Sequence, residues 1–215
     1  MTIALFDLDN TLINRQWALA AWAADFSRDH DLEEGAEQRL LDVLCKRAYP
    51  ATFERLRQEL ALEAPAAQLW DEYVTGIAAG VPRRQDVIEG LEQLRSAGWS
   101  LCILTNGAAD IQRAKVAAAG FTDAVDAIVI SEEIGARKPE PDAFHVAVAR
   151  CGGAPSARAW MVGDNPAGDI GGALQAGLRT IWLRGRPWPD DLPTPHHAVD
   201  DVTQAITLLL AGRDQ

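Results

Sequence analysis

Two acids two residues apart, Asp7 and Asp9, follow an apolar run at residues 3–6 near the start of the chain. That run is typical of a buried strand, and it delivers both carboxylates into the turn that follows. Carboxylates near a buried strand lose hydration and repel each other, which is costly unless a cation or a reaction uses them. The pair therefore indicates a chemical site, with an exposed acidic turn as the alternative.

Further polar groups follow three later apolar runs of the chain. They are Thr105 and Asn106 after residues 99–104, Lys138 after residues 125–130, and Asp164 and Asp169 after residues 159–162. Because ligands bind at the carboxyl ends of parallel strands, all of these side chains are expected at one edge of a sheet. These groups are two acids, a hydroxyl with an amide, a lysine and two more acids. So many polar groups at successive strand ends are unlike a chance distribution of surface residues.

The alternation of helix and strand from Val87 onward predicts the sheet that would position these groups. The expected strands are residues 3–6, 99–104, 125–130, 159–162 and 178–183, and the expected helices include 107–120, 141–150 and a closing helix through Leu209. Such alternation implies right-handed crossovers and a parallel sheet covered on both faces. The fold class predicted is a doubly wound, Rossmann-like α/β core, with residues 184–195 as a Pro-rich loop.

A helical insertion is predicted between the first strand and the rest of this core. Residues 14–82 show apolar positions at helical spacing and no convincing strand, with Asn14 as a helix cap and with Pro50 and Pro65 as breaks. Gly76 and Gly80 suggest a flexible exit. We therefore predict a core of residues 1–13 and 83–215 and a helical cap of residues 14–82.

Composition excludes several classes of protein. The chain has 215 residues and a formal charge of -11, which argues against sequence-independent binding to nucleic acid polymers. No apolar run is long enough to cross a bilayer and no signal region precedes Asp7, so a cytoplasmic protein is expected. Cys45, Cys102 and Cys151 are expected to be reduced core thiols. The His196-His197 pair is expected to lie in a solvated turn.

The strand-end residues resemble the motifs of the haloacid dehalogenase-like hydrolase superfamily. Its Asp-x-Asp-x-Thr motif is matched by Asp7, Asp9 and Thr11, its strand ending in Thr or Ser by Thr105, its Lys-Pro by Lys138, and its Gly-Asp with a further Asp by Asp164 and Asp169. All four motifs occur in order. The chain looks most like the helical-cap (C1, subfamily I) phosphatases, although Asn10 replaces the Gly that many relatives carry.

The resemblance implies a mechanism that the chemistry of these residues supports. Asp7 would attack phosphorus as the nucleophile, and Asp9 would act as general acid and then base. Mg2+, a hard cation, would be held by the carboxylates of Asp7 and Asp164, the main-chain carbonyl of Asp9, and Asp169 directly or through water. Thr105, the Asn106 main-chain N-H and Lys138 would bind the phosphoryl oxygens.

The cap would select the substrate, with Arg15, Trp17, Arg47, Tyr49 and Thr52 as candidate contacts. The expected activity is hydrolysis of a small phosphorylated metabolite, such as a nucleotide, a sugar phosphate or phosphoglycolate, by a monomer or homodimer. A phosphomutase and a 2-haloacid dehalogenase are alternatives of the same fold. A non-catalytic metabolite-binding protein is the alternative outside the enzymes, and it would show a missing nucleophile, acid, lysine or metal ligand.

Overall fold

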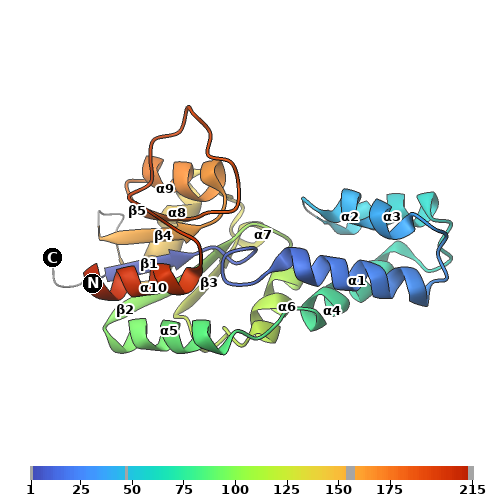
Figure 1. Ribbon diagram of the computed structural model, residues 1–215, viewed down its shortest axis with the longest axis horizontal. Coiled ribbons are helices and arrows are strands. Elements are labelled where there is room, and N and C mark those ends of the chain that lie inside the picture. Colours follow the sequence, from blue (N-terminus) through green and yellow to red (C-terminus); the bar gives the residue numbers. More distant parts are fainter. Residues whose placement is uncertain (1, 47, 154–157, 213–215) are drawn as a thin grey trace.

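The core is a parallel sheet with its first strand near the middle. The computed structural model describes residues 2–46, 48–153 and 158–212, and within them the sheet has six strands in the order β3-β2-β1-β4-β5-β6 (Figure 1). The strands are β1 (Thr2–Phe6), β2 (Trp99–Thr105), β3 (Ala127–Ile130), β4 (Ala159–Gly163), β5 (Arg179–Leu183) and β6 (His197–Val199). The strand order reverses beside β1, where open parallel sheets bind ligands.

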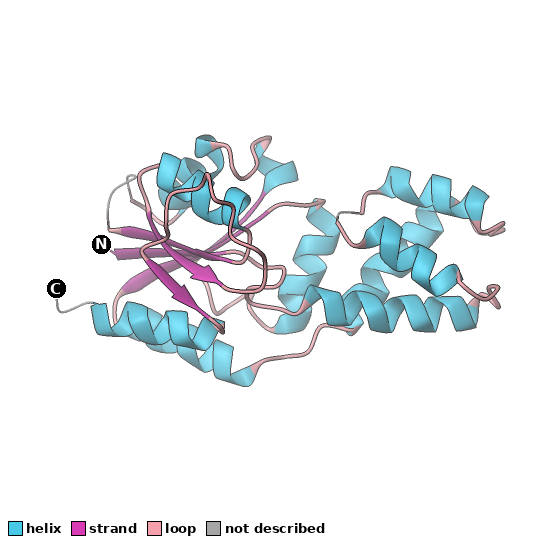
Figure 2. Ribbon diagram, turned by 45° about the horizontal axis from the view of Figure 1, so that its top comes forward, coloured by secondary structure: helices cyan, strands magenta, loops and turns pink. Residues whose placement is uncertain are grey.

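The strands present alternate residues to two helical layers. Along β1, Ala4 and Phe6 pack on one face, and Ile3 and Leu5 pack on the other. The first face is covered by α5 (Gln85–Ser96), α6 (Ala109–Ala119) and α10 (Val202–Ala211), and the second by α8 (Pro141–Arg150) and α9 (Gly172–Gln175) (Figures 1 and 2). Short elements complete the core: α7 (Ser131–Ile134) and the π-helical turn η1 (Pro166–Gly171). The doubly wound, Rossmann-like prediction is confirmed.

Four helices between β1 and α5 form a separate layer, which we call the helical unit. They are α1 (Arg15–Asp29), α2 (Ala36–Leu44), α3 (Pro50–Glu59) and α4 (Ala66–Ala79). Asn14 caps α1 as predicted, since its Oδ1 accepts a hydrogen bond of 3.0 Å from the Trp17 N-H. The unit projects to one side of the sheet (Figure 1) and contacts the core through α4 and α6.

An aromatic cluster holds the helical unit together. The ring centroids of Trp22 on α1 and Tyr73 on α4 lie 4.8 Å apart with an edge-to-face orientation, which aromatic pairs favour. Phe53 of α3 lies 5.1 Å from the Tyr73 ring. Gly76 lies inside α4, where an added Cβ would be 2.3 Å from Trp22 Cδ1. The prediction of a flexible exit is therefore wrong at Gly76, because this glycine allows close packing of α1 on α4.

The segment after β5 contains a strand that the sequence did not indicate. The loop through Pro195 agrees with the prediction, but His197 begins β6, which pairs with β5. The Thr180 N-H donates a 3.2 Å hydrogen bond to His196 Nδ1, and the Trp160 ring stacks on His197. Both histidines are exposed, as predicted, but the prediction of a turn is wrong for His197, because it begins a strand whose partner β5 comes earlier in the chain.

The thiols differ in exposure. Cys102 and Cys151 are buried and free, but Cys45 is exposed and caps the carboxyl end of α2. The prediction of a core thiol is thus wrong for Cys45. Among the described residues, no helix combines the length and the apolar character that crossing a bilayer requires.

Candidate active site

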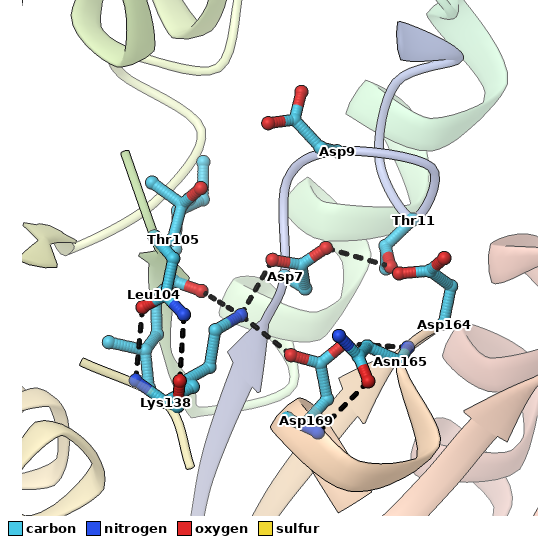
Figure 3. A network of polar contacts seen from close by, with 12 residues as sticks. Asp7, Asp9, Thr11, Leu104, Thr105, Lys138, Asp164, Asn165 and Asp169 are labelled. Atoms are coloured by element: carbon cyan, nitrogen blue, oxygen red, sulfur yellow. Dashed lines mark hydrogen bonds and ion pairs between the residues drawn. The ribbon is translucent and has the colours of Figure 1, made fainter. Parts of the chain in front are cut away.

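The ends of β1, β2 and β4 and the loop after β3 meet at one edge of the sheet. Asp7 directly follows β1, Thr105 ends β2, and Asp164 directly follows β4. Lys138 reaches the same place from the segment between α7 and α8 (Figure 3). The structure therefore brings together the side chains that the strand-end argument expected to meet.

Lys138 is the central cation of this cluster. Its Nζ lies 2.6 Å from Asp7 Oδ1 and 2.8 Å from Asp169 Oδ1, and it donates a hydrogen bond of 2.7 Å to the Leu104 carbonyl oxygen. Its side chain is only 2% exposed, so these three acceptors use all three ammonium donors away from water. Burial lowers the pKa of Lys138, but Asp169 and Asp7 outweigh burial and raise it above its usual range.

The pKa of Asp7 is strongly shifted by its surroundings. Burial raises the pKa of its carboxyl to about 8, with Asp169 and Asp164 adding to the rise and Lys138 opposing it. Its Oδ2 accepts a 3.3 Å hydrogen bond from Thr11 Oγ1. The pKa of Asp164 is likewise raised by burial and by Asp169. The acids at this edge thus gather more negative charge than Lys138 compensates.

The acid cluster has the donor set of a hard divalent cation. Asp7, Asp164 and Asp169 each offer a carboxylate oxygen within 4.8 Å of the others. Asp169 is fixed by the Asn165 N-H, which donates a 2.9 Å hydrogen bond to its Oδ2. An added Cβ at Gly163 would lie 2.3 Å from that same oxygen, so glycine permits the acid to approach the strand end. Buried oxygen donors with excess negative charge fit Mg2+.

Asn106 supports Lys138 through its side chain. Its Oδ1 accepts a 3.0 Å hydrogen bond from the Lys138 N-H, and its Nδ2 donates a 2.9 Å hydrogen bond to the Lys138 carbonyl oxygen. The sequence suggested only that its main-chain N-H faces a ligand. Asn106 therefore ties the end of β2 to the lysine segment, which explains why an amide follows Thr105.

Asp9 lies apart from the other acids, with its carboxylate turned away from Asp7 (Figure 3). Lys115 Nζ lies 2.7 and 2.8 Å from its two carboxylate oxygens, and Gln112 Nε2 donates a 3.2 Å hydrogen bond to its Oδ2. Although burial raises the pKa of Asp9, Lys115 and Arg15 outweigh it, and the net pKa is below the usual value. For Lys115, burial lowers the pKa despite the contact with Asp9.

The turn that carries Asp9 needs a special backbone conformation. Asn10 has a φ of 64°, in the left-handed region that glycine and asparagine tolerate best. Its N-H donates a 2.7 Å hydrogen bond to the Ile13 carbonyl oxygen, which closes the turn before α1. Asn10 is therefore a structurally compatible replacement for glycine at this position.

Sequence reasoning missed Gln112, Lys115 and Arg186. Gln112 and Lys115 lie on the buried side of α6 beside Ile111 and Val116, and polar residues at core-facing positions were the available signal. Arg186 lies after β5, and its Nε is 2.7 Å from Asp164 Oδ2. The available signal for Arg186 was its place in the segment that follows the β5 strand end, since the other strand ends supply site residues.

The predicted cap contacts are only partly gathered at the site. Arg15 lines the same cavity as Asp9, and its Nη atoms donate hydrogen bonds of 2.6 and 2.8 Å to the carbonyl oxygens of Leu44 and Cys45. Three others do not line it: Trp17, which is 67% exposed, and Tyr49 and Thr52, which form the start of α3. Arg47 lies outside the described residues. Trp17 faces solvent, and Tyr49 and Thr52 cap α3, which explains why these three residues do not reach the cavity.

The cavity at the site has a volume of about 450 Å³, within the range of small-molecule sites. It lies between the strand ends and the helical unit, which contributes Arg15, Lys46 and Tyr73 to its wall. A larger hollow of about 1020 Å³ lies at the far end of the helical unit. Most of its ionisable residues are acids, including Glu33 and Glu63, so it does not suit a phosphate group.

Similar proteins identify the family. A phosphoserine phosphatase of Thermus thermophilus is 40% identical over 190 residues, covering 88% of this chain and 67% of that protein. A ribulose-1,5-bisphosphate 5-phosphatase of Halopiger xanaduensis is 33% identical over 200 residues, covering 84% of this chain and 83% of that protein. The crystal structure of a 2-haloacid dehalogenase from Pseudomonas syringae matches with a TM-score of 0.71 and 28% identity, covering 98% of this chain and 99% of that one. Residues 4–183 match the family model described as haloacid dehalogenase-like hydrolase, and the chain belongs to this family.

Proposed function

We propose that this protein is a Mg2+-dependent phosphomonoester hydrolase that acts on a small phosphorylated metabolite. The observation that carries the proposal is the distinct environment of each acid in the first motif. Asp7 is buried beside Lys138 and two further carboxylates, whereas Asp9 lies separately on the wall of the same cavity. In this proposal Asp7 serves as the nucleophile, and Asp9, on the cavity wall, serves the leaving group.

In this proposal, the Asp7 carboxylate attacks phosphorus and the ester P-O bond breaks, which leaves an aspartyl-phosphate. Because Lys115 and Arg15 lower the pKa of Asp9, its carboxylate must take up a proton when substrate binds, and it then gives that proton to the departing alkoxide oxygen. It then takes a proton from the water that attacks the aspartyl-phosphate, so that inorganic phosphate leaves and both acids return to their first state. Splitting hydrolysis in this way replaces one difficult displacement with two easier ones, and positioned proton transfer contributes about 10²- to 10⁴-fold.

The other residues of the site bind and neutralise the phosphate. Lys138 is a fixed positive charge beside Asp7, and the Thr105 hydroxyl with the Asn106 N-H adds donors at the neighbouring strand end. Mg2+, held by Asp7, Asp164, Asp169 and the Asp9 carbonyl, would neutralise phosphoryl oxygens when bound. Phosphoryl transfer depends mainly on such positioning and charge neutralisation.

The helical unit acts as a cap over the cavity in this proposal, with the cap comprising residues 14–82. A volume of about 450 Å³ suits a metabolite rather than a folded protein. The phosphoserine phosphatase and the ribulose-1,5-bisphosphate 5-phosphatase among its relatives act on small phosphate esters by their names. We propose a substrate of that size, selected by the wall that Arg15, Lys46 and Tyr73 form.

Phosphate release from a panel of phosphomonoesters, with Mg2+ and with EDTA, tests the proposal. We expect turnover of at least one ester that requires Mg2+ and falls by about 10²-fold or more in Asp7→Asn and Asp9→Asn. Asp190→Asn, a change at an exposed loop acid, is the matched control and should keep full activity. Metal-independent turnover, or normal turnover by either site variant, would contradict the mechanism.

Dehalogenation is the second candidate, because the 2-haloacid dehalogenase structure is 28% identical to this chain. A dehalogenase also uses an aspartate nucleophile, but it needs neither a second acid at Asp9 nor a divalent cation. Chloride release from 2-chloropropionate, measured beside phosphate release, separates the two activities. Chloride release that survives EDTA and Asp9→Asn would favour the dehalogenase.

A further inference from the structure

The first motif contains two carboxylates, and each has a separate buried lysine. Asp7 pairs with Lys138, and Asp9 pairs with Lys115 of α6. The Lys115 side chain is 2% exposed, and both of its short contacts to Asp9 lie under 3 Å. Burying a lysine is costly, so a partner that satisfies its charge is required. Each carboxylate of the motif is thus paired with its own ammonium group.

Gln112 joins this second pair to the strand end. Its Nε2 donates one hydrogen bond to Asp9 Oδ2 and another to Thr105 Oγ1. The Gln112 side chain is buried, and Gln112 and Lys115 are one helical turn apart on α6. All four residues line the cavity that also holds Asp7 and Lys138. A purely structural ion pair between α6 and the turn would not need the additional link to Thr105.

We propose that Lys115 and Gln112 are positioning residues that hold the Asp9 carboxylate on the cavity wall beside Thr105. The inference rests on the proposed function, in which Asp9 serves the leaving group. With both oxygens contacted from α6, the carboxylate is kept from turning toward Lys138 and the acids around Asp7. The two acids thereby stay in separate places, one at the phosphorus and one at the leaving oxygen.

The dependence of rate on the leaving group tests this role, because acid assistance matters most when the departing oxygen is a poor leaving group. The value of kcat/KM is measured for an alkyl phosphate and for 4-nitrophenyl phosphate with wild type, Lys115→Met, Gln112→Met and Asp9→Asn. We expect the loss of kcat/KM in Lys115→Met to be at least about tenfold larger on the alkyl ester than on the aryl ester, and Asp9→Asn should show the same bias. Gln112→Met should shift in the same direction by less.

Two further variants separate positioning from support of the fold. Lys115→Arg keeps a cation near Asp9 and should recover part of the alkyl-ester activity. Arg113→Met removes an exposed arginine of the same helix that pairs with Glu133, and it should leave both substrates unaffected. If Lys115→Met does not fold, Gln112→Met and Lys115→Arg still report on the leaving-group dependence.

The outcomes distinguish the two proposals. Equal losses on alkyl and aryl esters, in an enzyme whose wild type is active, would overturn the positioning role and leave the proposed function intact. A wild type that hydrolyses no phosphomonoester would refute the proposed function, and the positioning role with it. Unequal losses that Lys115→Arg partly reverses would support both.

Discussion

Replacing Asp7 with asparagine is expected to stabilise the metal-free protein at alkaline pH while it removes the proposed nucleophile. Asp7 is buried with Asp164 and Asp169 nearby, and burial with those acids raises its pKa from 3.8 to about 8. The asparagine side chain has nearly the same shape and no charge. Lys138 keeps Asp169 and the Leu104 carbonyl as partners in the variant.

The sign and size of the effect follow from proton linkage. The unfolded chain releases the Asp7 proton near pH 4, but the folded protein retains it until about pH 8. Between these values unfolding releases a proton, so the free energy of unfolding falls as pH rises, by about 1.4 kcal/mol per pH unit. From about pH 5 to about pH 8 the wild type should lose roughly 4 kcal/mol through this group. Lys138, whose pKa is raised, also stabilises the folded protein through its ion pairs. That contribution is lost only at pH values above this range of about pH 5 to 8.

Urea denaturation in EDTA at several pH values measures the effect. The stability of wild type should fall steeply from about pH 5 to about pH 8, and that of Asp7→Asn should fall much less. Asp164, whose pKa is also raised, contributes the same sign in both proteins, so their difference reports on Asp7. Asp190→Asn should follow the wild type, and excess Mg2+ should flatten the wild-type curve. Parallel curves for wild type and Asp7→Asn would refute the reasoning.

Three other substitutions test packing and hydrogen bonding by urea denaturation. Gly76→Ala forces a methyl group against the Trp22 indole, so it should lower the free energy of unfolding by about 1–3 kcal/mol. Gly212→Ala, with open space around it, should lower it by less than about 0.5 kcal/mol. Asn106→Leu removes two hydrogen bonds to the lysine segment and should cost about 2 kcal/mol, along with most activity. Arg15→Met leaves two carbonyl oxygens at the end of α2 without their donor, so it should lower the free energy of unfolding by about 2–3 kcal/mol. Arg39→Met, which removes an exposed ion pair, should lower it by less than about 1 kcal/mol.

The parts of the fold that follow local rules were predictable from the sequence. Strands β1, β2 and β4 are mostly apolar, α8 begins at Pro141 as predicted, and Asn14 caps α1. The meeting of Asp7, Thr105 and Asp164 follows from the topology, because parallel strands end at one edge. Strand β6 was not predictable in this way. It has three residues, and its pairing and the partners of His196 come from distant strands.

The parts of the site that depend on packing were not predictable. Arg186 reaches Asp164 from a Pro-rich loop, whose path no local pattern specifies. In the sequence, Lys115 looks like an ordinary charged residue of a helix. Only the packing of α6 against the turn that carries Asp9 shows its contact with that acid. Likewise, Trp17 belongs to the predicted cap but faces solvent, since its position on α1 rather than its aromatic character decides exposure.

The contrast between Asp7 and Asp9 shows why spacing alone does not assign their roles. The two residues are chemically identical and separated only by Leu8, yet the pKa of Asp7 is raised and that of Asp9 is lowered. The cations that contact the two side chains differ, since Lys138 pairs with Asp7 and Lys115 pairs with Asp9. Lys138 is shared between Asp7 and Asp169, so it compensates Asp7 incompletely, whereas Lys115 contacts both oxygens of Asp9. Burial and the neighbouring charges thus push the two pKa values apart, so that a single motif holds two carboxyl groups in different electrostatic settings.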